Sequence, residues 1–251
     1  MLSMTVKELI LYCKENGIKG YSNKKKSLII DLINNNMTSS HEVQKHGFIW
    51  ENEIKTKIYN IRLEHCRYTS IMDIPKELNK INNAAISIKT TGRPNTICMA
   101  DVIRLYNITS SHEPFHLIVL IYDQIDDYKK IKNVVEINMT GSHELLFGHV
   151  KLDELKSLDS AVKAIPQKRS PTKEEHTELY KMKAELQQFM YIQLNIKCNS
   201  QQSRLQCSFN RFSDFLSMYP ERIIEKSAGN IFRGIELIDI RSCKRSFASK
   251  E

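Results

Sequence analysis

The sequence has no long apolar run. Its longest apolar stretch, from Leu117 to Tyr122, is far shorter than the roughly 20 residues that a membrane-spanning helix needs. Lys7 and Glu8 interrupt the first apolar residues, a pattern that is unlike a secretory signal. We therefore expect a soluble protein that is neither secreted nor embedded in a membrane.

Cysteine pairs and phosphate-binding glycine loops are also missing. The six cysteines form no CxxC pair and none has zinc-ligand spacing to a histidine, so we expect reduced, intracellular thiols and no zinc site. The chain has no GxxxxGK[ST] loop, no GxGxxG after a strand and no GxSxG elbow. These absences argue against ATP hydrolysis and nicotinamide binding, and we expect no nucleotide cofactor.

The charge balance is basic. Lys and Arg number 37 against 29 Asp and Glu, which gives a formal net charge of +8. Such a surplus favours polyanionic partners, either nucleic acid or an anionic membrane surface. Charge alone does not choose between these partners, and simple solubility is the alternative explanation.

The first 36 residues have the pattern of a small helical module. Thr5 and Glu8 have the spacing of a capping box, Gly17 ends the first helix, and a second amphipathic helix follows a glycine-bearing turn. The stretch TVKELILYCKENGIKGYSNKKKSLIIDLI, from Thr5 to Ile33, resembles the SAP motif, which implies binding to duplex DNA with little sequence specificity. The candidate DNA contacts are Lys19, Lys24, Lys25 and Lys26. The alternative for the last three is a solvated charge run.

The rest of the chain predicts one α/β domain. A polar linker over 37–45 leads to a continuous domain over 46–251. Its predicted elements are a helix over 49–63, a strand over 85–90, a helix over 96–106, strands over 115–122 and 134–139, helices over 151–162 and 172–188, strands over 191–197 and 204–209, and short helices after Asn210. Parallel strands 85–90 and 115–122 with a crossover helix would form a right-handed βαβ unit. The expected fold class is therefore α/β with a mixed sheet, of the α+β kind.

Four stretches in this order carry a second resemblance. They are GFIWENEI (47–54), MDIP (72–75), ISIKTTG (86–92) and CMADVIRLY (98–106). Together they resemble the core of the PD-(D/E)xK nuclease superfamily, which includes many restriction endonucleases. With the SAP-like module, the chain is similar to the restriction-endonuclease-like proteins of large DNA viruses. The resemblance implies an αβββαβ core and hydrolysis of phosphodiester bonds in duplex DNA with Mg²⁺, or Mn²⁺, as cofactor.

The same resemblance assigns roles to four residues. Asp73 stands at the position of the metal-binding aspartate, and Glu51 matches the accessory acid of the preceding helix. Ser87 and Lys89 stand at the acid-x-Lys positions, which strand geometry places on one face. The resemblance then implies Mg²⁺ held by Glu51 and Asp73, with Lys89 orienting the attacking water or stabilising charge on the phosphate.

Position 87 departs from the superfamily pattern, because a neutral serine is a poor ligand for a hard cation. Either Glu51 becomes a direct ligand, or Asp101 enters from the following helix, or the site is inactive. We prefer an active site built on Asp73 and Glu51. Each residue also has an ordinary interpretation: Lys89 as an exposed strand lysine, Asp101 and Arg104 as a surface ion pair, and Glu51 as solvated helix charge.

A second candidate DNA-binding element lies at NSQQSRLQCSF (199–209). Strand alternation places Arg204, Gln206 and Ser208 on one face, and such side chains hydrogen-bond to base edges in the major groove. We therefore include Gln202, Arg204 and Gln206 among the candidate DNA contacts. A polar hairpin face at a sheet edge is an equal alternative.

Three hypotheses follow for the function. The first is a Mg²⁺-dependent DNA endonuclease of restriction type, for which palindromic cutting would require a homodimer. The second is a DNA-binding or packaging protein that has lost its metal site, which Ser87 supports. The third is a structure-selective repair nuclease. All three have double-stranded DNA as the partner and none involves a membrane.

Overall fold

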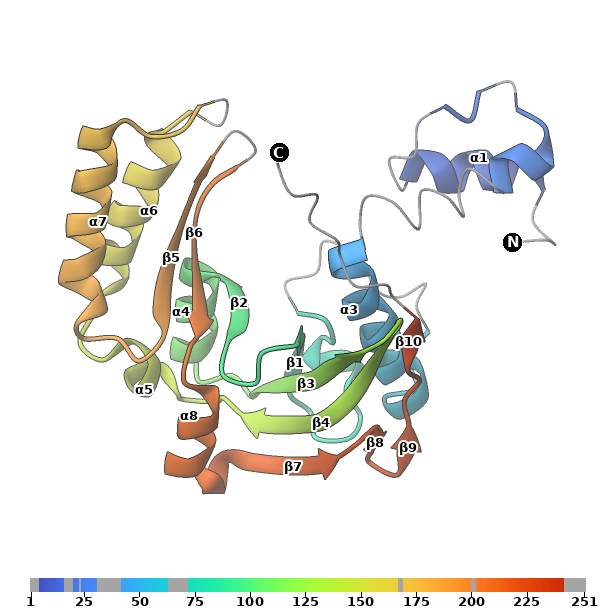
Figure 1. Ribbon diagram of the computed structural model, residues 1–251. Helices are drawn as coiled ribbons and strands as arrows, with labels where there is room; N and C mark the ends of the chain where they lie inside the picture. The colour runs from blue at the N-terminus through green and yellow to red at the C-terminus, as the bar shows by residue number, and fades with distance from the viewer. Residues whose placement is uncertain are drawn as a thin grey trace. The chain divides into compact units, whose positions relative to one another are not determined.

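The computed structural model describes residues 5–15, 20–22, 24–30, 42–62, 72–166, 169–199 and 202–241 (Figure 1). The chain divides into two compact units, Met1–Trp50 and Glu51–Glu251. Helix α3 (Glu42–Glu53) crosses this boundary. It begins before the predicted helix over 49–63 and includes the end of the segment that we assigned to a linker.

The first unit contains the predicted capped helix. Helix α1 (Val6–Glu15) begins with the capping box, because the Thr5 hydroxyl accepts a hydrogen bond from the backbone N–H of Glu8 at 3.3 Å. The Glu8 carboxylate in turn accepts one from the backbone N–H of Thr5 at 2.6 Å. Residues 26–30 are also helical, and Ile29 is buried together with Leu9 and Cys13. The predicted capping box and a small apolar core are therefore confirmed.

The second unit is built on a mixed five-stranded sheet. Its strands are β1 (Ala85–Thr91), β3 (Phe115–Ile125), β4 (Tyr128–Asn138), β7 (Ile223–Ala228) and β10 (Ile240–Arg241). β1 pairs with β3 in parallel and the other pairings are antiparallel. The predicted parallel pairing of the strands at 85–90 and 115–122 is confirmed. Residues Phe115–Ile121 are all buried, as expected for a strand that is covered on both faces.

A second sheet corrects the prediction of a helix over 96–106. Residues Ile97–Asp101 form strand β2, and helix α4 begins only at Val102 and ends at Ser110. Ile97 and Met99 are buried whereas Cys98 is exposed, so this short stretch has the period of a strand. Strand β2 pairs with β6 (Gln202–Phe209), which pairs with β5 (Gln193–Asn199), and both pairings are antiparallel.

Helices α6 (Leu152–Ala164) and α7 (Lys173–Gln187) pack against the second sheet, and α5 (His143–Phe147) and α8 (Phe212–Met218) are two shorter helices. In Figure 1, α6 and α7 lie on one side of the β5–β6 hairpin. One apolar core joins the two sheets and these helices, and it includes Leu117 of β3, Leu158 of α6 and Phe209 of β6.

The C-terminal part contains strands that the sequence analysis missed. Short helices were expected after Asn210, and α8 and a 3₁₀ turn at Pro220–Arg222 are present. They are followed by β7 and β10 and by the hairpin of β8 (Ile231–Phe232) and β9 (Ile235–Glu236). These strands are short or lie at the sheet margin, where the alternation of apolar and polar residues is weak. No helix within the described residues is long and apolar enough to cross a bilayer.

Candidate active site at strand β1

The candidate site is built around the carboxylate of Asp73. The neighbouring residue Ile74 forms an isolated antiparallel bridge with Ile86, and this bridge holds the segment against strand β1. The Oδ2 atom of Asp73 accepts hydrogen bonds from the backbone N–H of Ile88 at 2.6 Å and from the Ser87 hydroxyl at 3.2 Å. The Lys89 ammonium lies 3.7 Å from the same oxygen. Asp73, Ser87 and Lys89 therefore form one cluster.

Strand alternation explains why Ser87 and Lys89 share this cluster. Ile86 and Ile88 are buried on one face of β1, whereas Ser87 and Lys89 alternate with them and are only partly buried. The side chains of Asp73 and Lys89 remain 24% and 25% exposed, so solvent reaches both. The cluster is thus held by a buried strand and is open to a ligand from one side.

Glu51 on helix α3 brings a second carboxylate to the cluster. Burial raises the pKa of the Glu51 carboxyl, and the negative charge of Asp73 raises it further, against the opposing effect of Lys55 and Lys89. The charge of Asp73 thus disfavours ionisation of Glu51. Asp73, Ser87 and Lys89, which were predicted site residues, are therefore in direct contact, and the charges of Asp73 and Lys89 also act on Glu51, the fourth predicted residue.

Lys55 belongs to the same cluster, and the sequence analysis did not include it. Its ammonium forms an ion pair with the Glu51 carboxylate, and its side chain is only 7% exposed. Lys55 lies in a π-helical turn, η1 (Ile54–Ile58), that continues α3. Turns of this kind occur frequently at functional sites. The spacing of four residues between Glu51 and Lys55 is the sequence signal that could have identified it.

Asp101 has a different role from the one that we considered for it. It ends strand β2, and its carboxylate caps helix α4 by accepting a hydrogen bond from the backbone N–H of Arg104 at 2.8 Å. Its charge acts on Lys163 and Cys207. Within the described part of the chain, Asp101 shares no hydrogen bond or ion pair with Glu51, Asp73 or Lys89.

The cluster contains two carboxylates, Glu51 and Asp73, and each has a lysine partner. Among the residues that the structure describes, no group of three His, Cys, Asp or Glu side chains is arranged to hold a metal ion. Mg²⁺ is commonly held by one or two carboxylates together with waters and substrate phosphates, and Glu51 and Asp73 are such a pair. The two lysines balance the two carboxylates in formal charge.

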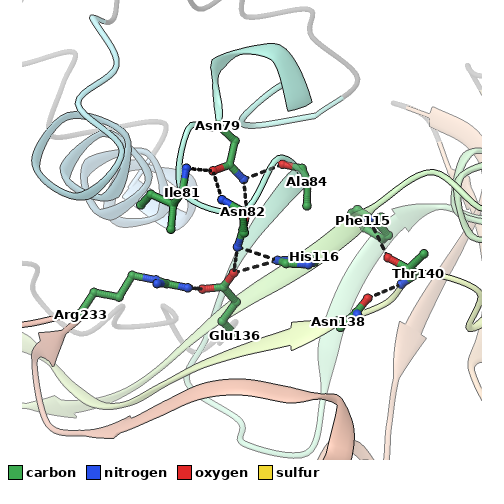
Figure 2. A network of polar contacts seen from close by, with 10 residues as sticks. All are labelled: Asn79, Ile81, Asn82, Ala84, Phe115, His116, Glu136, Asn138, Thr140 and Arg233. Atoms are coloured by element: carbon green, nitrogen blue, oxygen red, sulfur yellow. Dashed lines mark hydrogen bonds and ion pairs between the residues drawn. The ribbon is translucent and has the colours of Figure 1, made fainter.

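A buried polar network supports the segment that carries Asp73 (Figure 2). The Asn79 side chain donates to the carbonyl of Ala84 at 2.7 Å and accepts from the backbone N–H of Ile81 at 3.1 Å, which fixes the turn before β1. The Asn82 amide donates to the carboxylate of Glu136 at 3.1 Å. The same amide lies 3.1 Å from the ring Nδ1 of His116, so this turn is tied to strands β3 and β4.

Glu136 is the centre of this network and is completely buried. Its carboxylate contacts the ring Nδ1 of His116 at 2.9 Å and the Arg233 guanidinium at 2.6 Å. Burial pushes the pKa of Glu136 upward, but these two partners outweigh it and hold the pKa below the usual range. Burial also raises the pKa of the neighbouring Tyr59. We interpret the network as a structural support that connects the β8–β9 hairpin to the central sheet.

The predicted DNA-binding residues lie in other segments of the sequence than this cluster. Lys24 and Lys25 are exposed and Lys26 is half-buried at the start of the helical residues 26–30. Arg204 and Gln206 lie on strand β6, Gln202 begins this strand, and Lys19 lies outside the described residues.

Fold and site together define a protein of the mixed α/β class with a carboxylate–lysine cluster beside a parallel strand pair. Comparison with known protein families, curated proteins and solved structures gives no match for this chain.

Proposed function

We propose that the protein is a Mg²⁺-dependent endonuclease that hydrolyses phosphodiester bonds of duplex DNA, with a restriction-type specificity. One observation carries the proposal: α3, the segment before β1, and β1 itself bring Glu51, Asp73, Ser87 and Lys89 into one partly exposed cluster. The parallel pairing of β1 and β3 across α4 supports a restriction-endonuclease-like core as the finer description of the fold. A SAP-like DNA-binding module at residues 1–36 and a homodimer on palindromic sites belong to the same proposal.

The chemistry of the cluster suits phosphodiester hydrolysis. Glu51 and Asp73 would hold Mg²⁺, which acts as a Lewis acid and lowers the pKa of a bound water. Asp73 keeps a fixed orientation because the Ile88 N–H and the Ser87 hydroxyl both donate to its Oδ2 atom. Within the described residues its other oxygen accepts no hydrogen bond and is free to bind a ligand.

The lysines stabilise negative charge around the reacting phosphate. Lys89 donates to a phosphate oxygen and stabilises the charge that develops when water attacks the phosphorus. Lys55 favours the ionised form of Glu51, because its ammonium opposes the effect of burial, which raises the pKa of that carboxyl. Lys55 is thus a positioning residue for Glu51.

The proposal is tested by incubating the full chain with plasmid and phage DNA in Mg²⁺, Mn²⁺ or EDTA, beside a Lys89→Ala variant. We expect discrete fragments that need metal and that are absent with the variant. Intact DNA under every condition would overturn the proposal of an endonuclease.

The second candidate is a DNA-binding or packaging protein without catalytic activity. Ser87 favours it, because serine replaces the second acid beside Asp73, and so does the balance of charges that Lys55 and Lys89 create. Its expected result is DNA that is retarded in a gel but remains uncut in every metal.

A further inference from the structure

The β5–β6 hairpin has one apolar and one polar face. Leu194, Leu205 and Cys207 are completely buried in the apolar face, against which helix α6 packs. Figure 1 shows α6 and α7 on this side of the hairpin. The hairpin can therefore present only its polar face to a partner.

Two cations lie directly opposite each other on the polar face. The pairing of β5 with β6 places Lys197 opposite Arg204, and both side chains are exposed. Like charges that are directly opposite on neighbouring strands destabilise a sheet. Among the residues that the structure describes, neither side chain has a hydrogen bond or an ion pair. A polyanionic partner would offset this repulsion.

The next pair along the hairpin is uncharged and polar. Asn195 lies opposite Gln206, and both are partly exposed. Asn195 donates to the Ser208 hydroxyl at 3.0 Å, and that hydroxyl donates to Asn210 at 2.9 Å. This end of the polar face is therefore fixed by its own hydrogen bonds. Gln206, in contrast, makes no hydrogen bond through its side chain within the described part of the chain.

Strand β2 pairs with β6 from Gln206 to Phe209, so the hairpin is a two-stranded ribbon from Leu205 to its turn, the part that carries Lys197 and Arg204. The polar face of this ribbon matches the major groove of DNA. The groove is wide enough for a two-stranded β-ribbon, arginine binds the O6 and N7 acceptors of guanine, and glutamine binds the N6 and N7 atoms of adenine. Phosphates on both sides of the groove supply the negative charge that a Lys–Arg pair lacks.

We infer that the β5–β6 hairpin lies in the major groove of duplex DNA, where Arg204 contacts guanine, Gln206 contacts adenine and Lys197 contacts phosphate. The inference rests on the proposed function for its substrate class. To the predicted contacts Arg204 and Gln206 it adds strand β5 and Lys197, which alternation within β6 alone did not indicate.

The test compares two double variants of the full chain, both in a Lys89→Ala background so that DNA stays intact. Lys197→Ala/Arg204→Ala removes two charges from the polar face, and Lys173→Ala/Lys181→Ala removes two exposed charges from α7. Binding to a pool of random duplexes is measured by fluorescence anisotropy. We expect at least about tenfold weaker binding for the hairpin variant and less than about twofold for the control. Equal losses, or no loss, would overturn the inference.

A second arm tests the groove. Duplexes with 7-deazaguanine lack the guanine N7 acceptor of the major groove. We expect them to bind the Lys89→Ala protein about tenfold more weakly than normal duplexes, and Arg204→Ala to remove this difference. Equal binding of both duplexes by the protein with Arg204 would contradict placement in the major groove.

The two proposals can fail separately. If the wild-type chain cuts DNA and the hairpin variant binds as well as its control, the nuclease proposal stands and the hairpin inference is wrong. If the wild-type chain cuts nothing and the hairpin variant still loses binding, the hairpin inference stands and the nuclease proposal is wrong. A chain that neither binds nor cuts DNA would overturn both.

Discussion

The carboxylate of Asp73 accepts a hydrogen bond of 2.6 Å from the backbone N–H of Ile88. Ile88 lies on β1 between Ser87 and Lys89, two residues of the candidate site. Ser87 and Lys89 flank Ile88 on the opposite face of the strand and both contact the same oxygen atom, Oδ2 of Asp73. The position of the acid is therefore set by the strand itself. This relationship leads to the following predictions.

Replacing Asp73 by Asn should abolish cleavage without unfolding the protein. The amide oxygen can still accept the hydrogen bond from Ile88, whereas the charge that binds the cation is lost. We expect the cleavage rate to fall by about 100-fold or more. The control is Asp123→Asn, which removes an exposed carboxylate paired with Lys132. Equal activity of both variants in a plasmid assay would contradict the assignment of Asp73.

Replacing Ser87 by Asp should strengthen metal binding. The change adds a carboxylate beside Asp73, and the affinity of an oxygen site for a divalent cation rises with its ligand charge. We expect the Mg²⁺ concentration for half-maximal cleavage to fall by about tenfold. Ser87→Ala, which removes only the hydroxyl, should leave that concentration almost unchanged. An unchanged Mg²⁺ requirement for Ser87→Asp would mean that position 87 does not face the cation.

Replacing Lys55 by Met should raise the pKa of Glu51 in the metal-free protein. Burial and the charge of Asp73 already raise this pKa, and Lys55 opposes both effects. The measurement is an NMR titration of the glutamate side-chain carboxyl carbons. Lys57→Met is the matched control, because Lys57 pairs with Glu53 and its side chain is 41% exposed. A Glu51 titration that does not move would show that Lys55 has no electrostatic role.

Replacing Glu136 by Gln should destabilise the fold at neutral pH. The carboxylate is completely buried against Arg233 and His116, and removing one partner of a buried ion pair costs about 3–5 kcal/mol. The free energy of unfolding in urea gives this difference directly.

The destabilisation caused by Glu136→Gln should be smaller at low pH. The folded-state pKa of Glu136 is below its value in the unfolded chain, so the stabilisation is present above the unfolded pKa of about 4.3 and declines as pH falls through the folded-state pKa. Urea denaturation at pH 7 and at pH 3 should therefore show a smaller difference between wild type and variant at pH 3. A constant difference would mean that the charge of Glu136 does not stabilise the fold.

Local sequence patterns predicted the elements that have strong periodicity or clear caps. The alternation in β1, the continuous burial of β3 and the Thr5–Glu8 capping box of α1 all correspond to short-range rules. The prediction of a helix at Ile97–Asp101 was wrong, because these five residues fit a strand and the start of a helix equally well. Their pairing with β6 makes them a strand. Strand β7 depends on its antiparallel pairing with β4, which no local pattern reveals.

The candidate site was also predicted only in part, because some of its contacts depend on packing between distant segments. Glu51, Asp73, Ser87 and Lys89 were assigned by the resemblance of four stretches to the PD-(D/E)xK nuclease superfamily. Lys55 was missed because its burial comes from the packing of a π-helical turn, and Asp101 was included because the strand before α4 was not foreseen. Lys197 was missed because only the register between β5 and β6 places it opposite Arg204.

The most direct measurement is the rate of plasmid cleavage in Mg²⁺ by the wild-type chain, by Lys89→Ala and by Lys226→Ala. Lys226 lies exposed on strand β7, outside the cluster, and its replacement removes the same charge. The account predicts cleavage by the wild-type and Lys226→Ala proteins and none by Lys89→Ala. Cleavage by Lys89→Ala at the wild-type rate, or intact plasmid with all three proteins, would contradict it.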